Sequence, residues 1–159
     1  MNKTKKELAF IQFVKGECKK YGVKCKLRPT KYVKMDGNVK CSGWFDEEVP
    51  ELVVAMNRPD WIEILAHEYG HLTQWVEQVP IWKKAEVSLS KVWEWLDGKN
   101  CRTIEKHIGV ARDLELDNEK RAVKIIKNKN LVEAMSNKFN MKYEYLTPKL
   151  EKIFRTENI

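Results

Sequence analysis

Residues 65–75, LAHEYGHLTQW, contain two of the three histidines in the chain. On an α-helix, residues four apart lie on one face about one turn apart, so the imidazoles of His67 and His71 can converge on one ion. Glu68 is rotated by about 100° from His67, which lets its carboxylate reach a metal-bound water without itself binding the metal. The spacing predicts an H-E-x-x-H helix in which two neutral imidazoles hold zinc and the carboxylate acts on the water.

The residues around the motif favour a metal over two structural histidines on an amphipathic helix. The apolar neighbours are Ile64, Leu65, Leu72, Trp75 and Val76. They would sink the histidines and Glu68 into the fold, where polar groups need partners, and a metal supplies one.

A zinc site with an open catalytic position needs a third protein ligand. On a helix over DLELDNEKRAV (113–123) and the residues after it, one face holds Glu115, Glu119, Ala122 and Ile126. Buried glutamates are costly without partners, which a metal and a histidine N–H would provide. Glu115 and Glu119 are therefore both candidates for the third ligand, and His107 is a further candidate. The competing interpretation is a surface helix striped with ion pairs.

Two other kinds of metal site are disfavoured. A metzincin would have Gly at position 74 and His at position 77, where this chain has Gln74 and Glu77, so that class is excluded. Cys18, Cys25 and Cys41 could join in a structural zinc site, but such sites favour paired ligands and no CxxC pair occurs. Reduced thiols in a cytoplasmic protein are the expected state of the cysteines.

The periodicity of the chain predicts an α+β fold. Helical spacing covers residues 4–20, and alternating or apolar stretches at 23–35, 39–45 and 51–56 read as three or so short strands. Helices are expected at 59–79, at 81–96, from 103 or 108 to 128, and over some of 131–155. Four tryptophans, Trp75, Trp82, Trp93 and Trp95, are expected in the core because they bury much area where helices pack.

HEYGH followed some forty residues later by a glutamate-bearing helix resembles the gluzincin branch of the zincin-fold metallopeptidases, in its short single-domain form. Glu115, Glu119 and Ala122 resemble the family pattern of a ligand glutamate, an acid four later and an alanine seven later. The usual acid is Asp, so Glu119 departs from the pattern, and Asp117 competes with Glu119.

The resemblance implies a zincin-like fold with an N-terminal helix, a small sheet of three or more strands, the H-E-x-x-H helix and further helices. It implies a zinc-dependent peptidase that hydrolyses peptide bonds with a metal-activated water and Glu68 as general base. It also implies that residues 51–56 form an exposed sheet edge that pairs with a peptide substrate. Candidates for a donor to the oxyanion are Tyr143, Tyr145, His107 and Arg112.

With 159 residues, 43% hydrophobic and 33% charged, the chain is expected to form one soluble domain, 1–159. A helix and sheet occupy 1–58, and the helical part with the metal site occupies 59–159. No apolar run approaches the roughly 20 residues of a membrane helix, and no cleavage site follows the basic start, so neither membrane contact nor a signal peptide is expected.

The charge is concentrated near the N-terminus. Residues 1–40 contain 12 Lys or Arg and 3 Asp or Glu, within a chain of net charge +7. A solvated lysine-rich surface is the favoured interpretation, because no interleaving of aromatic and basic residues accompanies the charge. The alternative function is a non-catalytic zincin-like protein that docks on nucleic acid or a partner protein through this basic region. A further alternative is a protease guided to nucleic acid by it.

Overall fold

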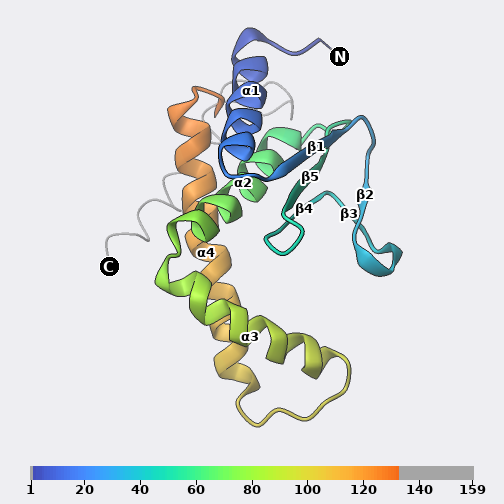
Figure 1. Ribbon diagram of the computed structural model, residues 1–159, viewed down its shortest axis with the longest axis vertical. Helices are drawn as coiled ribbons and strands as arrows, with labels where there is room; N and C mark the ends of the chain where they lie inside the picture. The colour runs from blue at the N-terminus through green and yellow to red at the C-terminus, as the bar shows by residue number, and fades with distance from the viewer. Residues whose placement is uncertain (1, 133–159) are drawn as a thin grey trace.

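The computed structural model describes residues 2–132, which form four α-helices, a three-stranded mixed sheet and a two-stranded sheet (Figure 1). The helices are α1 (Lys5–Lys20), α2 (Trp61–Glu77), α3 (Pro80–Leu96) and α4 (Ile104–Asn128). The strands are β1 (Lys24–Arg28), β2 (Val33–Lys34), β3 (Lys40–Cys41), β4 (Gly43–Asp46) and β5 (Glu51–Ala55), with a 3-10 turn, η1 (Asp36–Asn38). The predicted α+β class is confirmed. Beyond residue 132, the helix expected within 131–155 lies outside the described residues.

Helix α1 begins at a capping box. The Thr4 hydroxyl accepts from the Glu7 backbone N–H, and the Glu7 carboxylate accepts from the Thr4 backbone N–H, which satisfies two of the free donors of the first turn. Phe10, Val14 and Cys18, four residues apart, are buried on one face. The helix therefore covers the core as its apolar spacing predicts.

The three-stranded sheet has the order β1-β5-β4, with β1 parallel and β4 antiparallel to β5. The expectation that residues 51–56 form an exposed edge is wrong, because β5 is paired on both sides. Its sequence gives the reason: ELVVA is an almost continuous apolar run with its last four residues buried, as in a central strand covered on both faces. The edges are the more polar β1 and β4.

Helix α2 lies between the sheet and α4 (Figure 1). One hydrophobic core joins α1, the inner face of the sheet, α2 and the C-terminal half of α4. Its fully buried members include Phe10, Leu52, Val54, Trp61, Leu65, Leu72 and Leu131. The motif helix is therefore held from both sides.

Helix α3 and the N-terminal half of α4 form a hairpin that extends away from the sheet (Figure 1). Trp82 and Ala85 of α3 pack on Leu114 of α4 near its base. Towards the far end, Trp93 is 62% exposed and Trp95 is also exposed, so the expectation that these two tryptophans lie in the core is wrong. The reason is that, within residues 2–132, α3 packs mainly on α4, and one helix cannot cover a whole apolar face.

None of the helices in the described part of the chain is both long and apolar enough to cross a membrane.

Candidate metal centre

Two histidines of α2 and one glutamate of α4 come together as the motif predicts. The Nε2 atom of His67 lies 3.4 Å from Oε2 of Glu115, and Nε2 of His71 lies 3.5 Å from Oε1 of Glu115. These three residues form a group that could hold a metal ion, with the ligand atoms within 4.8 Å of one another. The two imidazole rings meet edge to face, so their Nε2 atoms approach one point from different directions.

The two separations between a histidine and Glu115 suit a small divalent ion. In a tetrahedral site with bonds of about 2.0–2.1 Å, as zinc prefers, neighbouring ligand atoms lie about 3.3–3.4 Å apart. The two histidine–glutamate separations are close to this value. The donor set of two imidazoles and one carboxylate also leaves a fourth position free, which is the arrangement of catalytic zinc sites.

The second ring nitrogen of His67 is held by Glu119. Nδ1 of His67 lies 3.1 Å from Oε1 of Glu119. An ionised carboxylate only accepts, so Nδ1 carries the proton and a neutral ring presents the lone pair of Nε2 towards Glu115. Glu119 thus lies behind the His67 ring and is not one of the three grouped residues.

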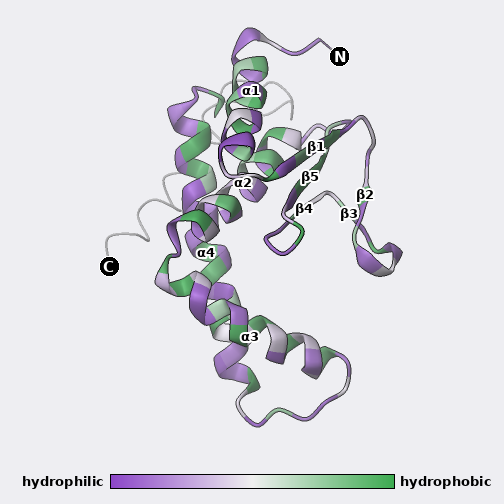
Figure 2. Cartoon of the chain, viewed as in Figure 1, coloured by the Kyte–Doolittle hydropathy of each residue, from purple (hydrophilic) through white to green (hydrophobic). Residues whose placement is uncertain are grey.

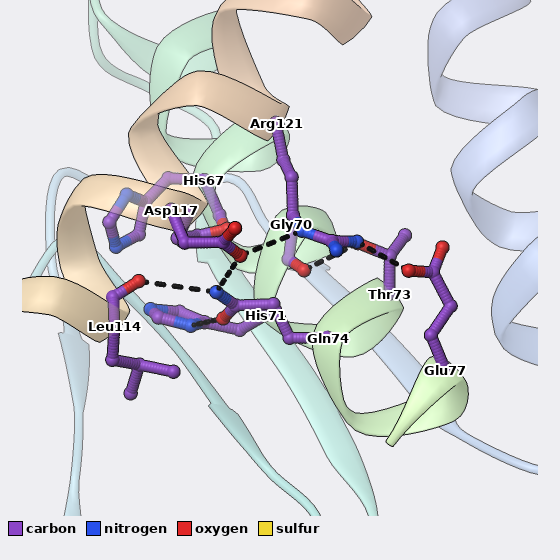
Figure 3. Close-up of polar contacts among 10 residues, drawn as sticks. His67, Gly70, His71, Thr73, Gln74, Glu77, Leu114, Asp117 and Arg121 are labelled. Carbon is purple, nitrogen blue, oxygen red and sulfur yellow. Dashed lines mark hydrogen bonds and ion pairs between the residues drawn. The ribbon is translucent and has the colours of Figure 1, made fainter. Parts of the chain in front are cut away.

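The second ring nitrogen of His71 is held by Gln74, a residue of its own helix. Nδ1 of His71 donates to Oε1 of Gln74 at 2.9 Å. The Gln74 amide nitrogen donates to the Leu114 carbonyl at 3.1 Å and to the Asp117 carboxylate at 2.7 Å (Figure 3). Both of those atoms are acceptors, which fixes the orientation of the amide and, through it, the tautomer of His71.

Arg121 completes this network on the far side of Asp117 (Figure 3). Its guanidinium donates to Asp117 at 2.9 Å, to Glu77 at 2.9 Å and to the Thr73 hydroxyl at 3.1 Å. Burial by itself lowers the pKa of Arg121, but the hydrogen bonds with Glu77 and Asp117 outweigh it and raise the pKa. The charged guanidinium therefore pairs with the same Asp117 carboxylate that accepts from Gln74.

Glu68 lies beside the histidines on the face of α2 that is turned to β4. Its side chain is buried, with 7% of the residue exposed, and within residues 2–132 its carboxylate makes no hydrogen bond. Gly43 of β4 leaves space for it: a Cβ there would lie 3.2 Å from Cγ of Glu68 and only 2.8 Å from Ile64. A largely buried carboxylate beside two histidines is a candidate for a functional group.

The pKa shifts follow from this packing. Burial raises the pKa of Glu68, although the two histidines oppose the rise. Burial also acts to lower the pKa of His67, but the hydrogen bond with Glu119 and the charges of the three neighbouring glutamates outweigh it, so the pKa is raised. The pKa of Glu115 is lowered, chiefly by the hydrogen bond with His71. Burial opposes this change, and the charges of His71 and His67 add to it.

The two ligand-side glutamates are less buried than predicted. Glu115 and Glu119 have side chains 53% and 51% exposed, because the buried stripe of α4 runs through Leu114, Asn118, Ala122 and Ile126, one residue to the side. The expectation that both carboxylates are buried is therefore wrong, although both lie close to the histidines. The centre consequently opens to solvent on this side.

Other sequence candidates lie elsewhere. His107, expected as an alternative ligand or oxyanion donor, is bonded to Ser88 and Thr103 near the start of α4 and is not part of the group. Arg112 pairs with Asp113. Tyr143 and Tyr145 lie outside the described residues. Cys18, Cys25 and Cys41 have free thiols and form no ligand group in the described chain.

Close contact between α2 and α4 brings the two halves of the centre together. Asn118 is fully buried and donates from Nδ2 to the backbone carbonyl of His67 at 2.9 Å. A Cβ on Gly70 would overlap Oδ1 of Asn118. The glycine of HEYGH is therefore needed for helix packing. Sequence reasoning missed Asn118 and Gln74, whose only signal was a polar residue at an apolar position.

Comparison of the chain with protein-family models, with curated proteins and with solved structures gives no significant match.

Proposed function

We propose that the protein is a zinc-dependent metallopeptidase with a zincin-like fold of the gluzincin type. The observation that carries the proposal is the arrangement of His67, His71 and Glu115, in which both imidazoles are fixed with Nε2 towards the carboxylate. A surface ion-pair cluster would not require Gln74 and Glu119 to set both tautomers. The resemblance of HEYGH and the later glutamate helix to gluzincins supports the same function.

The residues of the chain would divide the chemistry between them. His67, His71 and Glu115 would hold the ion. Bound there, zinc would lower the pKa of a coordinated water to about 7 and polarise the substrate carbonyl. Glu68, with its raised pKa, is suited to take a proton from the attacking water and to deliver it to the leaving amine.

A peptide substrate would pair with β4 in place of β5. Within residues 2–132, no strand pairs with the outer edge of β4, and an extended peptide can add to such an edge through backbone hydrogen bonds. Gly43, the first residue of β4, lies against Glu68. A strand added along β4 would therefore run past the general base.

The function is tested by zinc content and by Glu68→Gln. We expect about one zinc per chain after dialysis, and hydrolysis of a fluorescently labelled unfolded protein such as casein. Glu68→Gln should retain the zinc and lower kcat/KM by at least about a hundredfold, because the general base is lost. Glu86→Gln, on an exposed position of α3, is the matched control and should leave both unchanged.

Three outcomes would contradict the proposal. Hydrolysis that persists in Glu68→Gln would point to another active centre or to a contaminating protease. A protein that retains no zinc, with or without added metal, would make the histidines structural. Zinc retained without hydrolysis of any substrate tested would favour the alternative of a non-catalytic zincin-like binding protein.

A further inference from the structure

A groove of about 330 Å³ lies on the face of the sheet that is turned away from α2. Along β1, Cys25 and Leu27 pack towards the main core, so Lys26 and Arg28 point to the opposite face. Val53 of β5 and Trp44 of β4 line the floor of the groove, and Val33 and Lys34 of the β2–β3 hairpin form its wall. The groove and the metal centre therefore occupy opposite sides of the sheet.

The charge of this groove is positive. Arg28 and Lys34 are exposed, and neither makes an ion pair within the described residues. The one acid among the lining residues, Glu51, is neutralised by Lys26 at 2.7 Å. The segment between β1 and β2, drawn largely in the hydrophilic colour in Figure 2, adds Lys31. An anionic ligand would meet two unpaired cations and no unpaired acid among the groove's lining residues.

Two aromatic side chains lie among these cations. Tyr32 is 56% exposed at the mouth of the groove. The loop that carries it is held in place, since the Arg58 guanidinium lies over its ring at 5.5 Å and donates to the Lys31 carbonyl at 3.1 Å. Trp44 is half-buried in the floor and donates from its indole nitrogen to the Lys34 carbonyl at 3.2 Å. Folding thus creates the mixture of basic and aromatic groups that the linear sequence lacks.

We propose that this groove is a binding site for single-stranded nucleic acid. Phosphates would pair with Arg28 and Lys34, and a base would stack on the exposed ring of Tyr32, with Trp44 beside it in the groove. Aromatic platforms within a cationic groove are the usual means of binding single strands without sequence preference. In a duplex the bases are stacked inside and cannot reach Tyr32. The residues that line the protein groove lie on strands and loops, so no α-helix is placed there to enter the major groove of a duplex. A single strand is therefore the favoured ligand. This binding is independent of the peptidase proposal, because it uses none of the metal-centre residues.

The first experiment measures binding of a fluorescein-labelled oligothymidylate of about twelve nucleotides by fluorescence anisotropy, at salt concentrations between about 50 and 200 mM. Each phosphate contact in a single strand contributes about −0.7 to the slope of log K against log salt. We expect the double variant Arg28→Ala/Lys34→Ala to weaken binding and to make the slope less negative by about 1.4. Lys83→Ala/Lys84→Ala, two exposed lysines of α3, removes the same charge elsewhere and should leave the slope unchanged.

The second experiment tests stacking. Tyr32→Ala should raise the Kd for the oligonucleotide about tenfold, the loss of roughly one stacked base, and Tyr32→Phe should restore most of the affinity. Binding of heparin, a polyanion without bases, should not change in Tyr32→Ala. An unchanged melting temperature in every variant establishes that the fold is intact.

Several results would overturn the proposal. These are no binding of the oligonucleotide at the lowest salt, an equal effect of the Lys83/Lys84 control, an equal effect of Tyr32→Ala on heparin, or tighter binding of duplex than of single strand. Because the measurement requires no hydrolysis, loss of nucleic-acid binding and loss of peptidase activity are separate outcomes.

Discussion

Gln74 illustrates how a single buried amide can set the chemistry of a neighbouring histidine. It is fully buried, and its oxygen and both amide hydrogens are used by His71, Leu114 and Asp117. No water is needed to complete this set. The amide therefore connects α4 to the His71 ring through hydrogen bonds and holds the ring in the tautomer whose Nε2 lone pair is free.

Gln74→Met tests this role with a side chain of similar length that cannot accept from Nδ1. Zinc affinity should fall by about 10- to 100-fold, as for other partners behind metal-bound histidines. Stability of the metal-free protein should fall by about 1–3 kcal/mol, because buried acceptors lose their donor. Competition with a coloured zinc chelator measures the affinity. Gln12→Met, on the exposed face of α1, is the control, and an equal zinc affinity in both variants would contradict the positioning role.

Glu119→Gln tests the role of Glu119 beside His67 through the pH dependence of protein stability. In the metal-free protein burial acts to lower the pKa of His67, but the hydrogen bond with Glu119 and the charges of the neighbouring glutamates together outweigh it and raise the pKa. A raised folded-state pKa contributes stability that is fully present below the unfolded value of about 6.5 and lost as pH rises through the folded value. Glu119→Gln should therefore lower the pKa of His67 and destabilise the metal-free protein at acidic pH, but not well above neutrality.

NMR titration of the histidine ring protons gives the pKa directly, and urea unfolding at two pH values gives the stability. Glu105→Gln, an exposed acid in the first turn of α4, should leave the titration of His67 unchanged. A variant in which the pKa of His67 does not fall would show that Glu119 is not its partner in solution.

At the scale of residues, the sequence predicted what local spacing controls. The proximity of His67, Glu68 and His71 follows from one helical turn. The helical face indicated both Glu115 and Glu119, and the resemblance to gluzincins favoured Glu115, which the structure groups with the two histidines. Gln74 could not be recognised as a partner of His71, because its role depends on Leu114 and Asp117, which lie some forty residues away. The burial of Glu115 and Glu119 was overestimated because a shift of one residue rotates a helical face by about 100°.

The contact between α2 and α4 depends on the absence of a side chain at Gly70. Asn118 fills the space where a Cβ would lie and bonds the His67 carbonyl. Helices approach this closely only where a small residue allows it, and interiors have little spare volume to absorb an added methyl group.

Gly70→Ala should therefore displace Asn118, break its bond to His67 and move Glu115 away from the histidines. We expect a loss of stability of about 1–3 kcal/mol, together with weaker zinc binding, measured by thermal unfolding and by zinc titration. Gly70→Ala/Asn118→Ala should recover part of the zinc affinity, because the clash is removed.

The matched control is Gly109→Ala, in α4 itself, where a Cβ would meet nothing within 4 Å. There the substitution should be neutral or stabilise by up to about 1 kcal/mol, since alanine favours a helix over glycine. Equal effects of the two alanine substitutions would show that Gly70 is not needed for the close packing of α2 on α4.

At the scale of elements, the helices were predicted to within a few residues because caps and prolines mark their ends. Thr4 and Glu7 cap α1, and Pro80 begins α3. The place of β5 in the sheet was not predictable in this way. Its partners are β4 and β1, and each residue of β1 pairs with a residue 27 positions later in β5. The sequence of one strand does not determine which other strand it pairs with.

For the molecule as a whole, the candidate metal centre is a link between α2 and α4. Any ligand that binds only the folded state stabilises it by mass action, by about 2.7 kcal/mol at a hundredfold excess over Kd. Zinc should therefore raise the melting temperature, and a chelator should lower it again. His67→Ala/His71→Ala should abolish the response in thermal unfolding, and a response that survives in this variant would place the bound metal elsewhere.

The global arrangement was predicted in outline only. The α+β class follows from local periodicity, but the position of the α3–α4 hairpin away from the sheet does not, since periodicity gives an apolar face and not what covers it. The same limit applies to the groove around Tyr32 and Trp44, whose residues become neighbours only when β4 pairs with β5 and β2 with β3.

The unequal burial of the tryptophans affects how the protein appears in fluorescence. Trp61 and Trp82 are enclosed in apolar surroundings, whereas Trp93 and Trp95 already face solvent in the folded protein. Emission from the latter pair should lie near that of free indole and change little in wavelength on denaturation. The red shift on unfolding should therefore come from Trp61 and Trp82, together with the partly buried Trp44 and Trp75. Trp93→Phe/Trp95→Phe would remove emission that does not respond to unfolding and so increase the relative change in the signal.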